Sequence, residues 1–335
     1  MLISENISLK RYNTFGIDVK AKQFIEILSL QELSTLVATQ KDFFILGGGS
    51  NLLLTKNIDR LVVHIAIKGI SVINETENHV YVKAQAGENW HEFVLWCIGQ
   101  NYGGIENLSL IPGNVGTAPI QNIGAYGVEL KDSMYELDAL EITSNTVKTF
   151  SKEDCQFGYR NSVFKNDLKG KYIISSVTFK LTKKNHNLNN SYGAIQSELE
   201  KNNIKTPSIE AISNAVISIR KSKLPDPKEL GNSGSFFKNP VILKHQFRQL
   251  QHNFPEIPHY IISESEVKVP AGWLVEQCGF KGKRFGDAGI HKNQALVLVN
   301  YGNATGMEIL EISKKIQQTV HDTFNIVLEA EVNII

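Results

Sequence analysis

The chain has 335 residues, with 35 basic and 34 acidic side chains and a formal net charge of +1. This balance excludes bulk electrostatic binding of nucleic acid or of an anionic membrane, so we expect neither partner. Hydrophobic residues make up 42% and charged residues 21%, as in a folded globular protein, and the length allows two or three domains.

Targeting and redox features are few. No apolar run is long enough to cross a bilayer, and the first residues, MLISENISLKRYN, lack the apolar core of a signal peptide. The three cysteines, Cys97, Cys155 and Cys278, are scattered and show no paired metal-ligand spacing. We therefore expect a cytoplasmic protein with no disulfide framework and no metal site.

The predicted elements mix helices and strands without a regular strand–helix–strand repeat. Strands are predicted over 23–28, 43–46, 60–65, 79–87, 172–181, 295–300 and 325–335, with a hairpin over 138–150. Helices are predicted after Ser29, which with Glu32 has capping-box spacing, and over 89–100, 243–253, 271–278 and the stripe Ile309, Ile312, Ile316 and Val320. The Pro-, Gly- and charge-rich segment 221–234 predicts a domain boundary.

Two glycine-rich loops carry the first chemical signal. GGGSN at 47–51 follows a predicted strand, and successive glycines expose N–H groups that can hold a phosphate. The following LLLT favours a strand or turn over the helix of a dinucleotide fingerprint, and a tight turn between strands is the alternative. The second loop, 111–127, has four glycines and two prolines, and long ordered loops are usually functional. Together the loops favour a large nucleotide such as FAD.

The segment GNSGSFFKNP at 231–240 places two hydroxyls, Ser233 and Ser235, among glycines, aromatic rings and a lysine. It predicts a hydroxyl held at a dry, positively biased place, with an ordinary turn into a buried strand as the alternative. Arg160, in a loop beside Tyr159, could clamp a carboxylate or a developing oxyanion. Glu331 lies on the polar face of the last predicted strand and could serve as an acid or orienting group. Each of these charges could instead be an ordinary surface group.

In order along the chain, the motifs ILGGGSN, IPGNVGTAPIQNIGAYG, YRNSVFK, GNSGSFFKNP, PAGWLVEQCGFKG and NQALVLVN resemble those of the UDP-N-acetylenolpyruvoylglucosamine reductase family. The resemblance implies an α+β protein with an FAD-binding fold of the vanillyl-alcohol-oxidase/PCMH type in two lobes, plus a C-terminal α+β substrate-binding domain. It implies lobes over 1–67 with 322–335 and over 68–218, and a substrate domain over 225–321.

The same resemblance implies the site residues, which the chemistry of the side chains alone does not select. Its catalytic residues are Arg160, Ser235 as proton donor rather than Ser233, and Glu331 rather than Glu329. Its FAD contacts are Gly47, Gly48, Gly49, Ser50, Asn51, Leu52, Pro112, Gly113, Gly116, Thr117, Gln121, Asn122, Gly124 and Tyr126. Its substrate contacts are Tyr192, Lys223, Asn239, Lys268, Lys281 and Gln294, with Tyr192 on a loop that closes over the substrate.

The activity implied is reduction of UDP-N-acetyl-3-O-(1-carboxyvinyl)-glucosamine to UDP-N-acetylmuramate in peptidoglycan precursor synthesis. Non-covalent FAD is the expected cofactor and NADPH the co-substrate, with NADPH and the sugar nucleotide using one cleft of a monomer. The chain departs from the family pattern at Ala330, where a proline is common, and at Asn333, where a basic residue is frequent.

Two alternatives remain open at this point. The first is an FAD-dependent sugar or hydroxy-acid oxidase of the same superfamily, although neither glycine-rich loop has the cysteine or histidine that commonly attaches flavin there. The second is a nucleotide-sugar-binding protein without catalysis, in which Arg160 and Glu331 would be surface charges.

Overall fold

The computed structural model describes residues 2–335, which fold into two compact units. Unit 1 comprises the described residues up to Ile7, together with Ala21–Gly48 and Asp59–Ser222. Unit 2 comprises Ser8–Lys20, Gly49–Ile58 and Lys223–Ile335. The passage from unit 1 to unit 2 at 222–223 lies within the predicted boundary segment 221–234, whereas the predicted three-part division stays a prediction.

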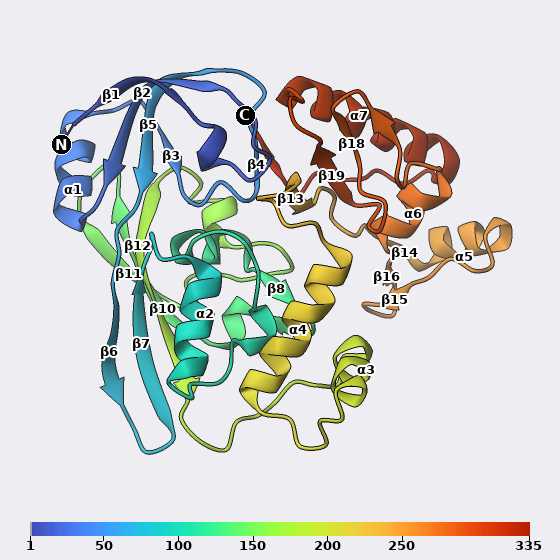
Figure 1. Ribbon diagram of the computed structural model, residues 1–335, viewed down its shortest axis with the longest axis horizontal. Coiled ribbons are helices and arrows are strands. Elements are labelled where there is room, and N and C mark those ends of the chain that lie inside the picture. Colours follow the sequence, from blue (N-terminus) through green and yellow to red (C-terminus); the bar gives the residue numbers. More distant parts are fainter. Residues whose placement is uncertain (1) are drawn as a thin grey trace. The chain divides into compact units, whose positions relative to one another are not determined.

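A four-stranded sheet forms most of the N-terminal part of unit 1 (Figure 1). Its strand order is β1-β2-β5-β3, from β1 (Ser4–Ser8), β2 (Lys20–Ile27), β3 (Phe43–Leu46) and β5 (Ile58–Ile65). Helix α1 (Leu30–Thr39) buries Leu33, Leu36 and Val37 in one core with this sheet. Ser29 caps α1 by accepting from the Glu32 N–H at 3.2 Å, but the Glu32 carboxylate accepts from Leu28, one residue earlier than a standard capping box.

A five-stranded antiparallel sheet forms the second layer of unit 1, in the order β11-β10-β12-β7-β6. Its strands are β6 (Ile70–Glu75), β7 (His79–Gln85), β10 (Met134–Glu141), β11 (Val147–Ser151) and β12 (Tyr172–Thr182), which confirms the predicted strands and hairpin in this region. Helix α2 (Trp90–Gly99) covers one face of the sheet (Figure 1), where Trp90 and Phe93 pack on Phe179 with ring centroids 5.8 and 5.0 Å apart.

The chain between α2 and β10 is long but ordered. It contains the short 3₁₀ turns η2 (Glu106–Leu108), η3 (Val115–Thr117), η4 (Pro119–Gln121) and η5 (Leu130–Asp132), and the small hairpin of β8 (Gly124–Ala125) and β9 (Val128–Glu129). Backbone hydrogen bonds of 2.8–2.9 Å join Trp90 to Gly113 and Val115 to Glu88. The second glycine-rich loop is therefore attached to the start of α2 rather than free at the surface.

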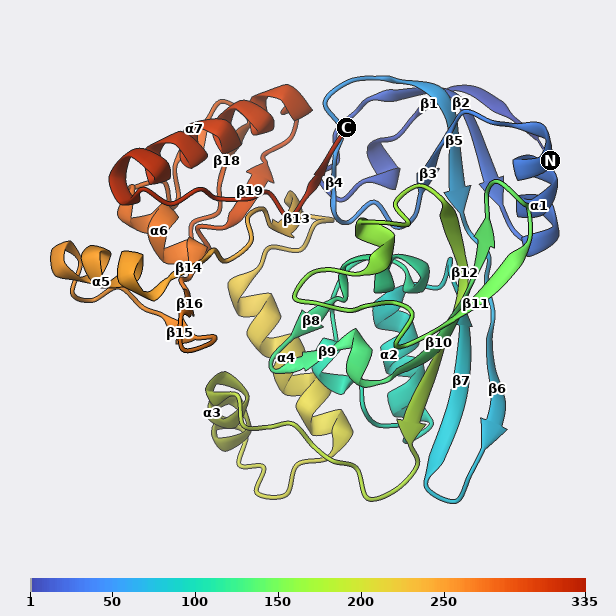
Figure 2. The ribbon, with the colours of Figure 1, turned by 180° about the vertical axis from the view of Figure 1, so that it is seen from behind.

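Two helices that the sequence analysis did not predict complete unit 1: α3 (Gly193–Lys201) and α4 (Ile209–Lys223), with the 3₁₀ turn η6 (Val163–Lys165). They share a buried cluster, which includes Ile195, Ile212 and Val216, and Tyr126 packs against it. Figure 2 shows α4 beside the β8–β9 hairpin. The stripe of Ile209, Ile212, Val216 and Ile219 has helical spacing, so a sequence signal for α4 was present.

Leu110 has a left-handed backbone, with φ of +59°, which is strained for a residue with a branched side chain. Two long side chains hold it there. The Leu110 N–H donates to Nδ1 of His91 at 3.0 Å, and Nε of Arg220 donates to the Leu110 carbonyl at 3.2 Å. Helices α2 and α4 thus fix the backbone just before the glycine-rich loop.

The hydrogen bonds of His91 and Arg220 to the backbone of Leu110, here called the Leu110 clamp, predict that the stability of the fold depends on pH. Burial, and then the charge of Arg220, lowers the pKa of His91 from its ordinary 6.5, with Glu92 opposing and Lys221 adding to the effect. Below about pH 6.5 the unfolded chain therefore binds a proton that the folded chain resists, so stability falls as pH falls. Protonation also replaces the Nδ1 acceptor with a donor.

We expect the wild type to lose more stability than His91→Asn when pH is lowered from about 7.5 to 5.5, because asparagine keeps an acceptor near Nδ1 and does not titrate. His91→Ala should cost about 1–2 kcal/mol at neutral pH. Urea unfolding of the FAD-loaded protein measures both effects. Equal pH dependence in wild type and His91→Asn would contradict the clamp.

Unit 2 is built on a four-stranded sheet in the order β13-β19-β18-β17. Its strands are β13 (Gly231–Ser235), β17 (Arg284–Phe285), β18 (Ala288–Ile290) and β19 (Val297–Asn300), with helices α6 (Ala271–Gln277) and α7 (Gly306–Phe324). Thr305 and Glu308 form a full capping box at the start of α7, and the predicted stripe of α7 is buried. The unit also contains η1 (Lys10–Tyr12), near its first residues.

A second, three-stranded sheet in unit 2 has the order β14-β16-β15 and carries α5 (Lys244–Asn253) beside it (Figure 1). Its strands are β14 (Val241–Leu243), β15 (Tyr260–Ile261) and β16 (Glu266–Lys268). Strand β16 pairs with both neighbours, so that Lys268 lies opposite Val241 on one side and Tyr260 on the other.

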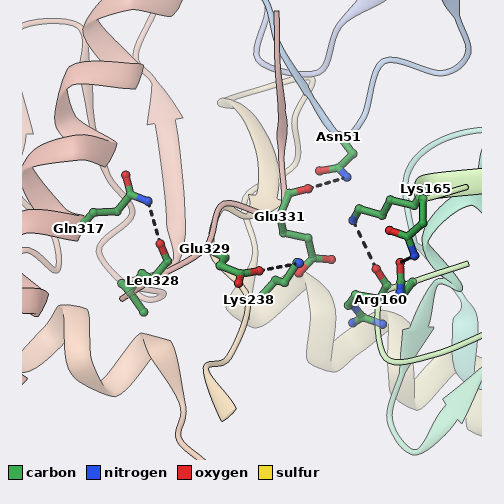
Figure 3. Close-up of polar contacts among 10 residues, drawn as sticks. Asn51, Arg160, Lys165, Lys238, Gln317, Leu328, Glu329 and Glu331 are labelled. Atoms are coloured by element: carbon green, nitrogen blue, oxygen red, sulfur yellow. Dashed lines mark hydrogen bonds and ion pairs between the residues drawn. The ribbon is translucent and has the colours of Figure 1, made fainter. Parts of the chain in front are cut away.

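The predicted C-terminal strand over 325–335 is mostly wrong. Only β20 (Asn333–Ile334) is a strand, and it pairs in parallel with β4 (Leu52–Leu53), as Figure 1 shows at the C-terminus. Ala330 makes one isolated bridge to Phe237, and Gln317 of α7 donates to the Leu328 carbonyl at 2.7 Å (Figure 3). The segment is extended, but it changes partner along its length and so never forms a continuous ladder.

Candidate functional site

The two glycine-rich loops meet in unit 1. A side chain on Gly47 would collide with Cγ2 of Thr117. A Cβ on Gly48 would lie 2.8 Å from Oδ1 of Asn114 and 2.9 Å from Cα of Gly113. The structure therefore brings together residues 47–48 and 113–117, which were predicted separately as cofactor contacts, at a backbone distance that only glycine allows.

The first glycine-rich loop continues into unit 2. Gly49 has φ of +60°, and a side chain there would overlap the carbonyl of Tyr12. Nδ2 of Asn51 donates to the Glu331 carbonyl at 3.1 Å (Figure 3). The Asn51 carbonyl accepts from both N and Nδ2 of Asn333, at 3.1 and 2.9 Å. Asn333, which the sequence analysis noted as a departure from the expected pattern, thus holds this loop in place.

Asn122, another predicted cofactor contact, has a buried side chain engaged by its own fold. Its Nδ2 donates to Glu129 at 3.0 Å and to the Gly158 carbonyl at 3.1 Å, and its Oδ1 accepts from the Lys131 N–H at 3.1 Å. These bonds join the second glycine-rich loop to the segment that carries Arg160. A cofactor contact from Asn122 stays a prediction, and its side chain already has a structural role. Gly116 likewise packs on Ala86, whose Cβ lies 2.5 Å from the position of an added Cβ.

Arg160 is half-buried and adopts an unusual left-handed φ of +52°. Its Nη2 donates to the Gly124 carbonyl at 2.8 Å, and Nζ of Lys165 donates to the Arg160 carbonyl at 3.3 Å (Figure 3). The guanidinium is thereby attached to the second glycine-rich loop. Strained backbone of this kind is retained where the surroundings impose it, often at functional sites.

Arg220 was missed by the sequence analysis. Besides its bond to Leu110, it interacts electrostatically with Arg160 and Tyr126. Burial is the main cause that lowers the pKa of Arg220; Tyr126 opposes this effect and Arg160 adds to it. The pKa of Tyr126 is itself raised by burial, against the Arg220 charge. Two guanidinium groups in this part of unit 1 produce a positive potential suited to an anion.

Tyr192, the predicted substrate residue of unit 1, lies against the second glycine-rich loop. Its ring meets that of Tyr126 edge to face, with centroids 5.4 Å apart at 90°, and Tyr192 remains 47% exposed. Asn189 ties the same segment to the loop by donating to the Gly127 carbonyl at 3.1 Å. Asn107 donates to the carbonyls of both Tyr126 and Asn189, at 3.2 and 2.8 Å.

The two serines of 231–240 differ in exposure, a difference that side-chain chemistry alone could not predict. Ser233 is buried and Ser235 is exposed. Between them β13 shifts register against β19: Asn232 pairs with Val299, but Ser235 pairs with Val297. The extra residue is a β-bulge at Gly234, where φ is +68°. Because of this extra residue, Ser235 does not share the burial of Ser233, although residues two positions apart in a regular strand lie on the same face.

Phe236 and Phe237 are 1% exposed, with ring centroids 5.1 Å apart, and they anchor the loop after Ser235. The Glu331 N–H donates to the Phe236 carbonyl at 2.8 Å. Glu331 and Ser235, two of the three predicted catalytic residues, thus lie on hydrogen-bonded neighbouring segments of unit 2. The types of side chain in the sequence could not predict that these two segments are neighbours.

The two glutamates of the C-terminal segment have different surroundings. Glu329 pairs with Nζ of Lys238 at 2.9 Å, and its side chain is 70% exposed (Figure 3). Glu331 is half-buried and lies next to the Ser235 loop. Glu331 is thus the less exposed of the two and is bonded closer to Ser235, while Glu329 neutralises a lysine; the catalytic role of Glu331 stays a prediction.

The remaining predicted substrate contacts lie in unit 2. Asn239 accepts from the Ala271 N–H at 2.9 Å and so caps the start of α6, while Lys281 pairs with Glu276 at 2.8 Å. Lys223 is exposed, and Lys268 and Gln294 are half-buried. Within residues 2–335 no helix is long and apolar enough to cross a membrane, and no group of three metal-ligating side chains was found in that range.

Comparison with known proteins decides the family. Residues 23–149 match the family described as FAD binding domain, and residues 226–335 match UDP-N-acetylenolpyruvoylglucosamine reductase, C-terminal domain. The chain is 63% identical, over 100% of both chains, to the UDP-N-acetylenolpyruvoylglucosamine reductase of Flavobacterium johnsoniae. Those of Amoebophilus asiaticus, 48% identical over 100% of both, and Pseudomonas putida, 46% identical over 98% of both, are also similar.

The chain belongs to the UDP-N-acetylenolpyruvoylglucosamine reductase family. The solved UDP-N-acetylenolpyruvylglucosamine reductase of Thermus caldophilus shares the fold, with a TM-score of 0.71 at 23% identity over 100% of this chain and 99% of that one. The predicted α+β fold with an FAD-binding part is confirmed, as is FAD as the cofactor, whereas the vanillyl-alcohol-oxidase/PCMH type stays a prediction. Membership of this reductase family decides against the oxidase and the non-catalytic alternatives.

The glycine backbone fits the cofactor of the reductase family. Gly47 and Gly48 leave no room for side chains where they meet Gly113, Asn114 and Thr117, and such backbone can approach a diphosphate and offer it N–H groups. The role of these residues in holding FAD stays a prediction.

We predict that Gly48→Ala weakens FAD binding by at least about tenfold, because the added methyl would push residues 113–114 away. The matched control is Gly99→Ala, since a Cβ on Gly99 would have no atom within 4 Å. Titration of the apoprotein with FAD, followed by flavin fluorescence, compares the two. Unchanged affinity in Gly48→Ala would contradict the placement of the cofactor at these loops.

Proposed function

We propose that Arg160, Ser235 and Glu331 are the residues through which this chain carries out the reaction of its family. That reaction is the NADPH-dependent reduction of UDP-N-acetyl-3-O-(1-carboxyvinyl)-glucosamine to UDP-N-acetylmuramate, a step of peptidoglycan precursor synthesis. The observation that carries the assignment is the hydrogen bond between Glu331 and Phe236, which makes Glu331 and the exposed Ser235 neighbours.

FAD, when bound, would supply the redox chemistry, which is the passage of hydride from NADPH to the vinyl carbon of the substrate farther from the ether oxygen. The protein's own task is to stabilise the charge that then develops on the substrate carboxylate and to protonate the other vinyl carbon. Arg160 suits the first part, since a guanidinium offers paired donors to a carboxylate and its bond to Gly124 fixes its position.

Ser235 is proposed to deliver the proton. A hydroxyl is a weak acid, so it can act only towards a strongly basic carbon and with its alkoxide stabilised. Lys238, three residues further along the same loop, supplies positive charge, although Glu329 partly neutralises it. Glu331 would orient the enolic group of the substrate or share in its protonation.

We propose that NADPH and the sugar nucleotide use one cleft in turn, because each would exchange hydride with the same bound FAD. Competitive inhibition of flavin reduction by the sugar nucleotide would support it. The predictions of a monomer and of a cytoplasmic location stay predictions, and sedimentation of the FAD-loaded protein would decide the first.

Ser235→Ala is expected to keep FAD reduction by NADPH and to slow reoxidation by the enolpyruvyl substrate about 10²–10⁴-fold, the usual contribution of a positioned proton donor. Stopped-flow absorbance of the flavin measures the two half-reactions separately. For comparison, Ser233→Ala removes a buried hydroxyl of the same loop that does not deliver the proton, so it should slow reoxidation by only about tenfold. Normal turnover by Ser235→Ala would refute the role of proton donor.

A further inference from the structure

Thr14 lies where three segments of unit 2 meet. Its N–H donates to the Gly49 carbonyl at 3.1 Å, and its carbonyl accepts from the Asn232 N–H at 2.9 Å. Its hydroxyl lies 3.3 Å from that of Ser233 and 3.5 Å from the Gly49 carbonyl. One residue thus contacts both the loop assigned to FAD and the strand that ends in Ser235.

The turn that carries Thr14 is held by other groups. Asn13 is buried, its Nδ2 donates to the carbonyls of Leu9 and Ile17 at 2.7 and 2.9 Å, and its Oδ1 accepts from the Ile17 N–H at 3.0 Å. The Phe15 carbonyl accepts from Nδ2 of Asn300 at 2.9 Å. The Thr14 hydroxyl is therefore not needed to form the turn, and it can be removed by itself.

The side chains of Asn232 and Ser233 hold the bulge before Ser235, and Nδ2 of Asn232 is itself bonded to the carbonyls of Pro225 and Leu230 at 3.2 and 2.8 Å. The Gly234 N–H donates to Oδ1 of Asn232 at 3.0 Å, and the buried Ser233 hydroxyl has Thr14 at 3.3 Å and the Leu52 carbonyl at 3.5 Å. Both contacts of Ser233 are with segments next to the glycine loop. The orientation of the bulge is thus linked to that loop through a pair of hydroxyls.

We propose that Thr14 is a positioning residue for proton transfer. Its hydroxyl, through Ser233, holds the bulge that presents Ser235, while its N–H holds Gly49 in the cofactor loop. The hydroxyl and the N–H of Thr14 thereby fix the position of Ser235 relative to the first glycine-rich loop. The proposal rests on the assignment of Ser235 as proton donor. A displacement of about 1 Å at a reacting group can cost about 10²-fold in rate, so a weak contact at this point has a measurable effect.

The test uses Thr14→Val, which keeps the shape of the side chain and the backbone bonds but removes the hydroxyl, and Thr14→Ser, which restores it. In the FAD-loaded enzyme we expect Thr14→Val to reduce FAD with NADPH within about twofold of wild type and to reoxidise with the enolpyruvyl substrate about tenfold more slowly. Thr14→Ser should recover the reoxidation rate to within about twofold. Thr35→Val is the control, because its exposed hydroxyl bonds only within α1.

Combination with Ser235→Ala shows whether Thr14 acts through the proton donor. Thr14→Val/Ser235→Ala should reoxidise no more slowly than Ser235→Ala alone, since the group that Thr14 positions is already absent. If Thr14→Val does not fold, Ser233→Ala breaks the same contact from the other side and should show the same selective loss.

Equal loss in both half-reactions, no loss in either, or additivity with Ser235→Ala would each overturn the proposal. These outcomes are distinct from failure of the proposed function. Normal reoxidation by Ser235→Ala would reject the proton donor itself, and the positioning role would then fall with it. Loss in Ser235→Ala but not in Thr14→Val or Ser233→Ala would reject only the role of Thr14.

Discussion

The hydrogen bond from the Glu331 N–H to the Phe236 carbonyl, at 2.8 Å, is the constraint on which the proposed proton-transfer end of unit 2 depends. It attaches the C-terminal segment to the loop of Ser235. The bond from Asn51 to the Glu331 carbonyl attaches Glu331 to the first glycine-rich loop as well. Both backbone groups of Glu331 are thus engaged. The backbone from which its carboxylate projects is therefore held in place, as an acid or orienting group requires.

In unit 1, close contact between backbone segments fixes the glycine-rich loops. Residues 47–48 and 113–117 meet at distances that exclude side chains, and Arg160 is bonded to Gly124 of the same loop. Leu110 and Arg160, which lie near this loop, both have a left-handed backbone conformation, which is strained for residues other than glycine. Long polar side chains from α2 and α4 hold the backbone of Leu110, just before this loop.

Local patterns in the sequence predicted most of the elements because each pattern reports a local cause. Alternation identified β7 and β12, the stripe of α7 gave its buried face, and glycines marked the two loops. The same approach failed at 325–335, where alternation suggested a continuous strand. There the chain pairs first with Phe237 and then with β4, and such a change of partner has no local signal.

The sequence by itself determined the family, the FAD requirement and the types of side chain available for the reaction, since these are carried by motifs in fixed order. Only the tertiary structure decided which serine is exposed, which glutamate lies beside it, and that Thr14 joins the cofactor loop to β13. Those distinctions depend on contacts between residues far apart in the chain, such as Phe236 with Glu331 and Thr14 with Ser233. No pattern within either segment contains them.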